Sequence, residues 1–313
     1  MAHTLHAILA LLPQTSSTTV PVTDSNALSK VGEQISSAAS HTAGETWILV
    51  LAALVLVGLL IGRLVRHNES PLAHRTVEEH PWWLYLACAF ATFVALSIGP
   101  SLATTLGLFK GDSPESYRLL VATQLCGSLV GALIGLLLVR LVVASASSSG
   151  LDIKLGDLPR GLLCFAIAIP VVFASGIIAT AIQRSMGGSI DTLAHPLLTK
   201  MADHQNDPWT LALIAHAVVL APIAEEVIFR GFLQSAALRL VKRAWLAATI
   251  SAVLFAAIHI GTGENAIPWY AIVPIFVLGL ANAIAFERTG RLGVPIVMHM
   301  AFNLANILLA RNA

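Results

Sequence analysis

The chain has 313 residues, of which only 11% are Asp, Glu, Lys or Arg and 56% are hydrophobic, and its mean hydropathy is +0.79. Soluble domains carry roughly 25% charged residues, so the composition excludes a soluble globular enzyme and a disordered chain. The net charge of +1 offers no basic surface, which excludes nucleic acid as a partner. The sequence therefore predicts a protein embedded in a lipid bilayer.

The N-terminal segment, residues 1–45, is polar and differs from the rest of the chain. A short apolar stretch at residues 6–12 precedes a segment rich in Ser and Thr, and no Lys or Arg stands before that stretch. A signal peptide normally begins with a basic region. We therefore predict a disordered polar tail, with a signal peptide as the alternative.

Eight apolar runs follow, each near the length of about 20 residues that a helix needs to cross the hydrocarbon core. The strands of a membrane barrel would be shorter and would alternate in polarity. The expected fold is thus all-α, a polytopic helical membrane protein with about eight transmembrane helices. The predicted spans are residues 46–64, 82–106, 119–143, 161–182, 209–233, 245–260, 266–286 and 292–310.

The third predicted span contains a regular pattern of small residues. Gly127, Gly131 and Gly135 recur at intervals of four residues and so share one helix face. A face of small residues lets another helix approach closely within a membrane. We interpret this pattern as a packing surface.

Three charged residues, Glu225, Glu226 and Arg230, are the only ones well inside a predicted span. Ionised groups in hydrocarbon cost at least a few kcal/mol each, so they normally face a polar interior and mark function. Positions 226 and 230 lie on one helix face and are predicted to pair, whereas Glu225 points about 100° away. The plainer interpretation, a buried ion pair beside a spectator carboxylate, is disfavoured because such a pair contributes little stability.

Two histidine motifs lie in other predicted spans. Phe255 and His259 are four residues apart in the sixth span, and His299 and Asn303 are four apart in the eighth. Counted at 1.5 Å per residue from the same side of the membrane, Glu225 and His259 lie about 21 Å deep and His299 about 12 Å. A single membrane histidine is usually a packing residue, but here the fifth, sixth and eighth helices are predicted to enclose one polar cavity.

Glutamate and histidine supply what peptide hydrolysis requires, namely a base that activates water and an acid for the leaving amine. A histidine and an asparagine amide can donate hydrogen bonds to an oxyanion. Whether the site also uses a divalent metal such as zinc stays open, because the same kinds of group bind such metals. The candidate metal ligands are Glu225, His259 and His299, although the chain contains no HExxH motif.

The motifs EEVIFR at residues 225–230, FAAIH at 255–259 and HMAFN at 299–303 occur in this order on separate predicted helices. This ordered set resembles the CAAX protease and bacteriocin-processing (Abi, type II CAAX prenyl endopeptidase) family of intramembrane proteases. The stretch ERTGRLGVPIVMH is similar to the family as well. The resemblance covers about residues 205–308, the expected catalytic core, and leaves residues 46–204 as membrane scaffold helices.

The resemblance implies four catalytic residues, Glu225, His259, His299 and Asn303, and three supporting residues, Glu226, Arg230 and Phe255. By this resemblance Glu225 activates the attacking water together with His259. His299 and Asn303 would stabilise the tetrahedral oxyanion. The family is commonly classed as metalloproteases, whereas direct activation of water needs no bound metal. The expected partners are a membrane-associated protein or peptide substrate and the lipid bilayer.

Two other functions remain open. A proton-coupled transporter could use Glu225 and His259 as a relay, but this function explains neither the pairing of His299 with Asn303 nor the lack of duplicated halves. A non-catalytic relative that acts as an immunity or scaffold factor is the other alternative. The intact motifs argue against it.

Three further polar residues receive simpler interpretations. His216 lies nine residues before Glu225, about half a turn around an α-helix, and is predicted to be structural. Asn282 in the seventh span is expected to form a hydrogen bond between helices. His195 lies in the loop between the fourth and fifth spans, and we predict no function for it.

Basic residues set the expected orientation. One side carries eleven: Arg63, Arg66, Arg75, Arg140, Lys154, Arg160, Arg239, Lys242, Arg243, Arg288 and Arg291. The other side carries six: Lys30, Lys110, Arg118, Arg184, Lys200 and Arg311. The richer side should be cytoplasmic, which places both termini outside the cell, in the plasma membrane if the source is bacterial.

Reporter fusions test this orientation. We expect alkaline phosphatase to be active when it is fused to the N-terminus, and green fluorescent protein to fluoresce when it is inserted between the third and fourth spans. Fluorescence from a fusion at the N-terminus would show that the orientation is reversed.

Overall fold

The computed structural model describes residues 43–60, 80–107, 116–144, 150–191, 195–261 and 266–311. Within these ranges every regular element is a helix, which confirms the predicted all-α fold. The predicted N-terminal tail lies outside the described residues except for its last three. The chain divides into two units, Met1–Thr46 and Trp47–Ala313, and the arrangement below is that of the second.

In the described ranges, six helices are long and apolar enough to cross a membrane: Ala43–Leu60, Tyr117–Val142, Asp157–Ser185, Trp209–Val241, Trp269–Thr289 and Gly293–Ala310. Two shorter apolar helices, Trp82–Ser97 and Ala244–Ala257, occupy the second and sixth predicted spans. The protein is thus a polytopic helical membrane protein, as predicted, although two of the eight predicted spans are shorter than expected.

The second predicted span is interrupted. Helix α3 (Trp82–Ser97) stops before Ile98, and the shorter helix α4 (Gly99–Thr105) follows it. Pro100 stands in the first turn of α4. Proline suits the start of a helix but has no N–H with which to continue a preceding one. The prediction of one continuous helix over residues 82–106 was therefore wrong at this point.

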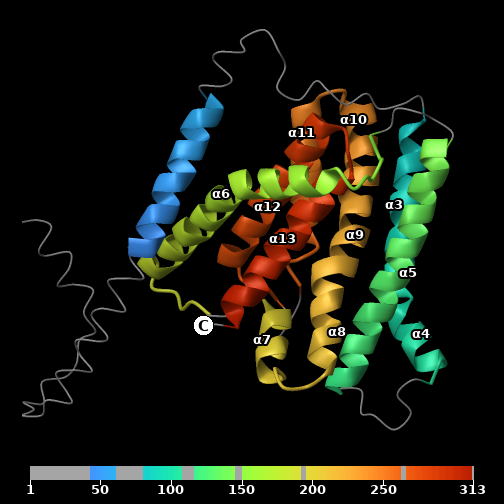
Figure 1. Cartoon of the computed structure of the whole chain (residues 1–313), viewed down its shortest axis with the longest axis horizontal. Coiled ribbons are helices and arrows are strands. Elements are labelled where there is room, and N and C mark those ends of the chain that lie inside the picture. Colours follow the sequence, from blue (N-terminus) through green and yellow to red (C-terminus); the bar gives the residue numbers. More distant parts are fainter. Residues whose placement is uncertain are drawn as a thin grey trace, which may run out of the picture. The chain divides into compact units, whose positions relative to one another are not determined.

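The glycines of the third span perform the predicted packing function. Helix α5 (Tyr117–Ala144) packs against α3 and α4 (Figure 1). A Cβ atom added to Gly127 would lie 2.6 Å from the carbonyl oxygen of Leu96, and one added to Gly131 would lie 2.5 Å from the Leu96 side chain. Any larger residue would therefore push α3 away from α5.

The helix at the centre of the second unit, Trp209–Val241, is continuous but not uniformly α-helical. In order, it comprises α8 (Trp209–Ala215), η1 (His216–Leu220), α9 (Ala221–Glu226), η2 (Val227–Gln234) and α10 (Ser235–Val241). Its two η segments are π-helical, with hydrogen bonds that span five residues. This geometry is rare in proteins, and where it occurs it is often at a functional site. The short α-helical piece α9 lies between the two η segments and carries both glutamates at its end.

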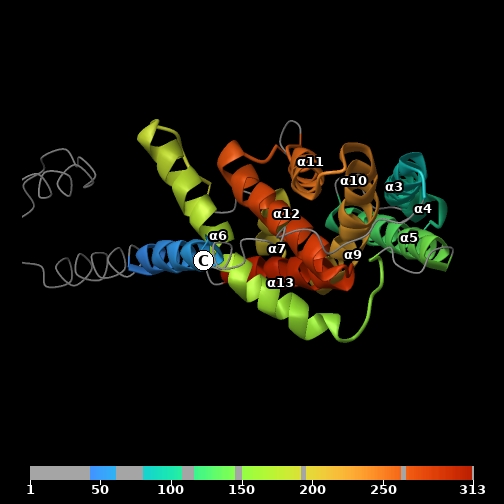
Figure 2. The same ribbon diagram turned by 90° about the horizontal axis from the view of Figure 1, so that it is seen from above.

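Four further helices pack beside this central helix or against its neighbours. They are α6 (Asp157–Ser185), α11 (Ala244–Ala257), α12 (Trp269–Thr289) and α13 (Gly293–Ala310). Helix α12 packs against α11, α13 and η2, and α6 packs against both α12 and α13 (Figures 1 and 2). Parts of the central helix also contact α3, α5 and α13. Helices α5 and α13 both contact α9, the segment that carries the two glutamates.

An ion pair fixes the start of α6 to the turn before α13. The carboxylate of Asp157 is 2% exposed and accepts hydrogen bonds from Nε and, at 3.0 Å, from Nη2 of Arg291. It also accepts the backbone N–H of Lys154 at 2.8 Å. The hydrogen bond with Asp157 raises the pKa of Arg291 above its ordinary value. A Cβ atom on Gly293 would collide with this carboxylate, so the turn requires glycine there.

Removing this guanidinium leaves a buried carboxylate without its cation. We expect Arg291→Ala to lower the free energy of unfolding by about 1.5–3 kcal/mol, the contribution of hydrogen bonds to a charged group. Thermal unfolding in detergent, followed by tryptophan fluorescence, measures the change. Arg288→Ala is the control, since Arg288 is exposed at the end of α12. Equal losses in the two variants would contradict a specific function of the ion pair.

Candidate active site

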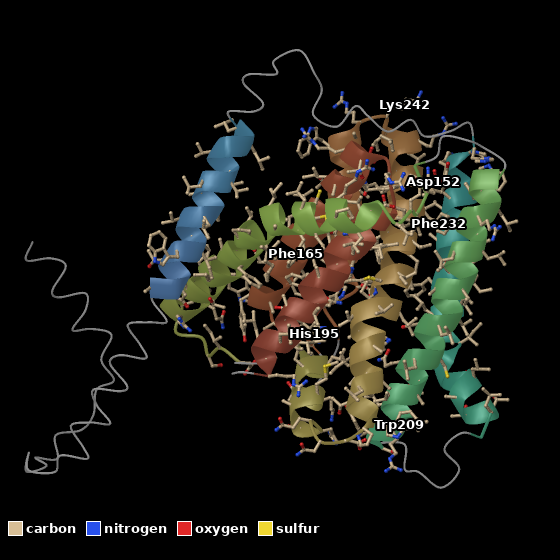
Figure 3. The ribbon with its side chains drawn as sticks, viewed as in Figure 1. Asp152, Phe165, His195, Trp209, Phe232 and Lys242 are labelled. Atoms are coloured by element: carbon tan, nitrogen blue, oxygen red, sulfur yellow. The ribbon has the colours of Figure 1, made fainter. Side chains whose placement is uncertain are left out.

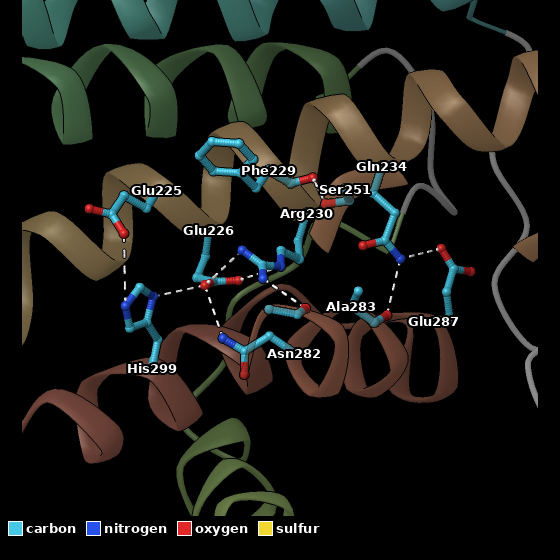
Figure 4. Close-up of polar contacts among 11 residues, drawn as sticks. Glu225, Glu226, Phe229, Arg230, Gln234, Ser251, Asn282, Ala283, Glu287 and His299 are labelled. Carbon is cyan, nitrogen blue, oxygen red and sulfur yellow. Dashed lines mark hydrogen bonds and ion pairs between the residues drawn. The ribbon is translucent and has the colours of Figure 1, made fainter. Parts of the chain in front are cut away.

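Glu226 is completely buried at the centre of the polar cluster (Figure 4). Its Oε1 atom accepts hydrogen bonds from His299 Nδ1 at 2.8 Å, Asn282 Nδ2 at 3.0 Å and Arg230 Nη1 at 3.1 Å. Its Oε2 atom lies 3.1 Å from Arg230 Nε. The predicted pair of Glu226 and Arg230 is therefore present, and Asn282 forms the interhelical hydrogen bond expected of it. Groups from η2, α12 and α13 all converge on this one carboxylate.

Arg230 is also held from two other directions. Its Nη2 atom donates to the carbonyl oxygen of Gly279 at 2.8 Å, and its guanidinium lies 4.5 Å from the centre of the Phe255 ring. A cation over an aromatic face is favourable, more so away from water. A Cβ atom on Gly279 would lie 3.3 Å from Arg230 Nη2 and 3.0 Å from Phe255. Glycine at this position lets α12 come close enough to accept a hydrogen bond from the buried guanidinium.

The row of polar residues continues one turn further along η2. Gln234 Nε2 donates to the carbonyl oxygen of Ala283 at 3.0 Å and to Glu287 Oε1 at 2.8 Å, and both Gln234 and Glu287 are completely buried. We call the residues Glu226, Arg230, Gln234, Asn282 and Glu287 the polar seam. Sequence reasoning missed two of its members. The spacing of four residues from 226 through 230 to 234 was the available signal for Gln234, whereas Glu287 resembled an ordinary charge at the end of a span.

The two adjacent glutamates have different surroundings. The side chain of Glu225 is 23% exposed and that of Glu226 is 0% exposed. His299 lies between them, with Nε2 at 3.8 Å from Glu225 Oε2 and Nδ1 at 2.8 Å from Glu226 Oε1. Glu226 is occupied by its partners in the seam. Glu225 is thus the carboxylate of this pair that can meet a substrate or a water molecule.

The geometry at His259 follows from the end of α11. Its Nδ1 atom lies 2.8 Å from the carbonyl oxygen of Phe255. That carbonyl belongs to the last turn of α11, where carbonyl groups lack partners within the helix. A carbonyl only accepts, so Nδ1 carries the proton and the neutral ring has its lone pair at Nε2. In this tautomer Nε2 of His259 is a hydrogen-bond acceptor.

Phe255 lies between the two histidines of the motifs. Its ring centre is 4.8 Å from that of His259 and 5.5 Å from that of His299. Phe229 packs edge-on against the same ring at 5.3 Å. One aromatic side chain therefore contacts both imidazoles and the Arg230 guanidinium, and the supporting function of Phe255 stays a prediction.

Asn303 lies one turn beyond His299 on α13. Its Nδ2 atom donates to the carbonyl oxygen of Ala217 at 2.7 Å, which joins α13 to η1. The half-turn predicted between His216 and Glu225 assumed a regular α-helix, but η1 begins at His216 and changes the angle between them. His216 is buried, and its Nδ1 atom finds no hydrogen-bond partner among the described residues.

The candidate metal ligands Glu225, His259 and His299 do not form a metal site as they stand. No group of three or more His, Cys, Asp or Glu side chains in the described part of the chain is arranged to hold a metal ion. His299 already uses Nδ1 on Glu226 and has Nε2 beside Glu225. We therefore derive no catalytic step through a metal.

Comparison with known proteins identifies the region that carries these residues. Residues 207–305 match the family model described as "Type II CAAX prenyl endopeptidase Rce1-like", which confirms the resemblance predicted from the three motifs. A protein of Escherichia coli described as an uncharacterized 24.3 kDa protein is 28% identical over 124 residues, 39% of this chain and 55% of that protein. The chain thus spans about half the length of this curated relative. No solved structure matches the chain.

The buried pair in the seam gives a stability prediction. We expect Arg230→Ala to lower the free energy of unfolding by about 3–5 kcal/mol, because it leaves the Glu226 carboxylate buried without its cation. Chemical unfolding in detergent, or the yield of folded protein where unfolding is irreversible, measures the effect. Arg239→Ala is the matched control, an exposed arginine on the same continuous helix. An Arg230→Ala variant as stable as this control would contradict the proposed importance of the pair.

Proposed function

We propose, starting from the match of residues 207–305 to the CAAX endopeptidase family, that this protein is an intramembrane endopeptidase. It hydrolyses a peptide bond of a membrane-associated protein or peptide. The observation that carries the proposal is the contrast between the two glutamates. Glu226 is buried, with three hydrogen bonds to its Oε1 atom and Arg230 beside its Oε2 atom, and Glu225 remains partly exposed beside His299. A partly exposed carboxylate inside an apolar helix bundle is costly and points to a function.

In the first chemical step, water attacks the carbonyl carbon of the scissile peptide bond. Glu225 accepts one proton of this water, and Nε2 of His259 orients the same water by accepting a hydrogen bond from its other O–H group. A bond forms between the water oxygen and the carbonyl carbon, and the electron pair of the carbonyl π bond moves onto its oxygen. The tetrahedral intermediate then collapses, the C–N bond breaks, and the accepted proton passes to the leaving nitrogen. Every proton in this scheme is supplied by water and side chains of the chain.

His299 and Asn303 stabilise the oxyanion. The Nδ1–H group of His299 already donates to Glu226, so a donor for the oxyanion must be the Nε2–H group of the doubly protonated ring. The carboxylates of Glu225 and Glu226 on either side offset the positive charge of that ring. Asn303 uses one amide hydrogen on Ala217 and has a second one to donate. Donors fixed before the reaction are the most effective stabilisers of developing charge.

Cleavage by two variants tests this mechanism. We expect Glu225→Gln and His259→Ala each to reduce turnover of a fluorogenic membrane-anchored peptide by about 10²–10⁴-fold, the usual contribution of a general acid–base group. The purified protein is assayed in lipid vesicles against a family of such peptides.

Asp203→Asn is the control for loss of a carboxylate, because Asp203 is exposed at the end of the short helix Pro196–Asp203. If Glu225→Gln cleaves as fast as this control, the assignment of the base is wrong. A vesicle flux that depends on Glu225, without any cleavage, would instead favour the transporter.

A further inference from the structure

A cavity of about 430 Å³ lies between three helices at one end of the second unit, and the proposed chemistry does not use it. Its lining comes from α7 (Pro196–Asp203), from α8 and from the last turn of α13. Figure 3 shows Trp209, the first residue of α8, at the end of the bundle where α7 also lies. Ligand-binding sites usually have volumes of about 300–1,000 Å³. The cavity is therefore large enough for a ligand.

The burial of the lining residues defines a floor and a mouth. Met201, Thr210 and Ile307 are buried, whereas Ala202 and Leu211 are exposed. The cavity thus reaches from the outside of the bundle to buried side chains of α7, α8 and α13.

The lining is mainly apolar, and two of its polar groups are already engaged. The hydroxyl of Thr210 donates to the carbonyl oxygen of His204 at 2.5 Å, and Asp207 Oδ1 accepts the backbone N–H of Trp209 at 2.9 Å. The two charged residues of the lining, Asp207 and Arg311, have opposite signs, so the cavity has no net charge that would attract an ion. A ligand would therefore be held chiefly by the burial of apolar surface.

The floor of the cavity adjoins the proposed oxyanion site. Ile307 lies four residues after Asn303 on the same face of α13, about 6 Å along the helix. Ile214 lies three residues before Ala217, whose carbonyl oxygen accepts from Asn303. Ala217 and Ile307 also belong to one buried cluster. The cavity and the Asn303 amide are thus about one helical turn apart along the same two helices.

The cavity also lies at the ends of two membrane-spanning helices. The helix Trp209–Val241 begins beside it, and the helix Gly293–Ala310 ends beside it. Tryptophan at the start of a span is typical of the interface between membrane and water. A peptide segment at this interface can reach the cavity, whereas lipid chains extend from the interface toward the centre of the bilayer.

We propose that this cavity is a specificity pocket, which binds a large apolar side chain of the substrate about two residues from the scissile bond. This inference rests on the proposed endopeptidase function. An extended peptide advances about 3.3 Å per residue, so two residues span the distance between the pocket and Asn303. A cavity of about 150 Å³ lined by Leu, Ile and Phe holds a benzene ring, so the larger pocket accommodates a phenylalanine side chain. The sulfur of Met201 in the floor can make a favourable contact with such a ring.

Substrate selectivity tests the pocket. The bond that is cleaved in a fluorogenic membrane-anchored peptide is first identified by mass spectrometry. The residues two positions away on either side are then changed, one at a time, between Phe and Ala. We expect Phe at one of these positions to raise kcat/KM by at least about tenfold, the discrimination that apolar pockets achieve between side chains of different size.

A variant that fills the pocket must remove this preference. We expect Ala202→Trp, at the mouth, to lower kcat/KM for the Phe peptide about tenfold while kcat/KM for the Ala peptide stays within about twofold. Ala181→Trp is the matched control, the same substitution at an exposed position of α6 that does not line the pocket, and it should keep the preference. If Ala202→Trp does not fold, Ala310→Trp, which fills the pocket from α13, replaces it.

Peptide binding decides the question independently of turnover. In a Glu225→Gln background, fluorescence anisotropy is measured with labelled membrane-anchored peptides in which one Phe is moved along an Ala segment. One position of Phe should lower the Kd about tenfold relative to the peptide without Phe, and Ala202→Trp should abolish the difference.

The outcomes separate the pocket from the enzyme. Equal Kd values at all positions of Phe, or an equal loss of kcat/KM for both peptides in Ala202→Trp, would overturn the pocket and leave the proposed endopeptidase intact. Release of a bound lipid by Ala202→Trp, with unchanged selectivity for peptides, would likewise overturn it. Absence of Glu225-dependent cleavage in the wild type would overturn the proposed endopeptidase itself, while the Kd values would still show whether the pocket takes an apolar side chain.

Discussion

The buried pair of Glu226 and Arg230 is the constraint on which the rest of the site depends. Both side chains are completely removed from solvent, so protein groups rather than water must offset the cost of burying their charges. The requirement reaches Gly279 and Asn282 on α12 and His299 on α13. Three helices are thereby fixed around one carboxylate, and the orientation of His299 is one result.

This arrangement explains why two consecutive glutamates serve different purposes. Glu226 organises the interior and has its negative charge balanced by Arg230. Glu225, one residue earlier, lies on another side of the helix and keeps partial exposure. Because His299 is in contact with both, the structural and the chemical parts of the site are joined through a single imidazole. A change that is meant to alter only the buried pair should therefore also move His299 and, through it, the groups proposed to react.

The sequence was most informative where hydrophobicity and short spacing decide the outcome. Hydropathy identified eight helical segments, and the four-residue spacing identified the pairing of Glu226 with Arg230. The two π-helical segments were not foreseen, because they depend on contacts with neighbouring helices that local sequence does not encode. The break at Ile98 was also missed, although Pro100 was a local signal for it. The burial of Glu287 was not predicted because its partner Gln234 is 53 residues away in the chain.

The length of α11 bears on how water reaches a reaction inside a membrane. Its 14 residues extend only about 21 Å, whereas the hydrocarbon core is roughly 30 Å thick. A helix this short requires the adjacent lipid to thin, or polar headgroups to bend inward, at a modest energetic cost. The half-buried His259, two residues beyond the end of α11, then stands close to the aqueous boundary although it belongs to the bundle. Such thinning of the bilayer beside α11 would give water a short path to His259, which the proposed hydrolysis requires.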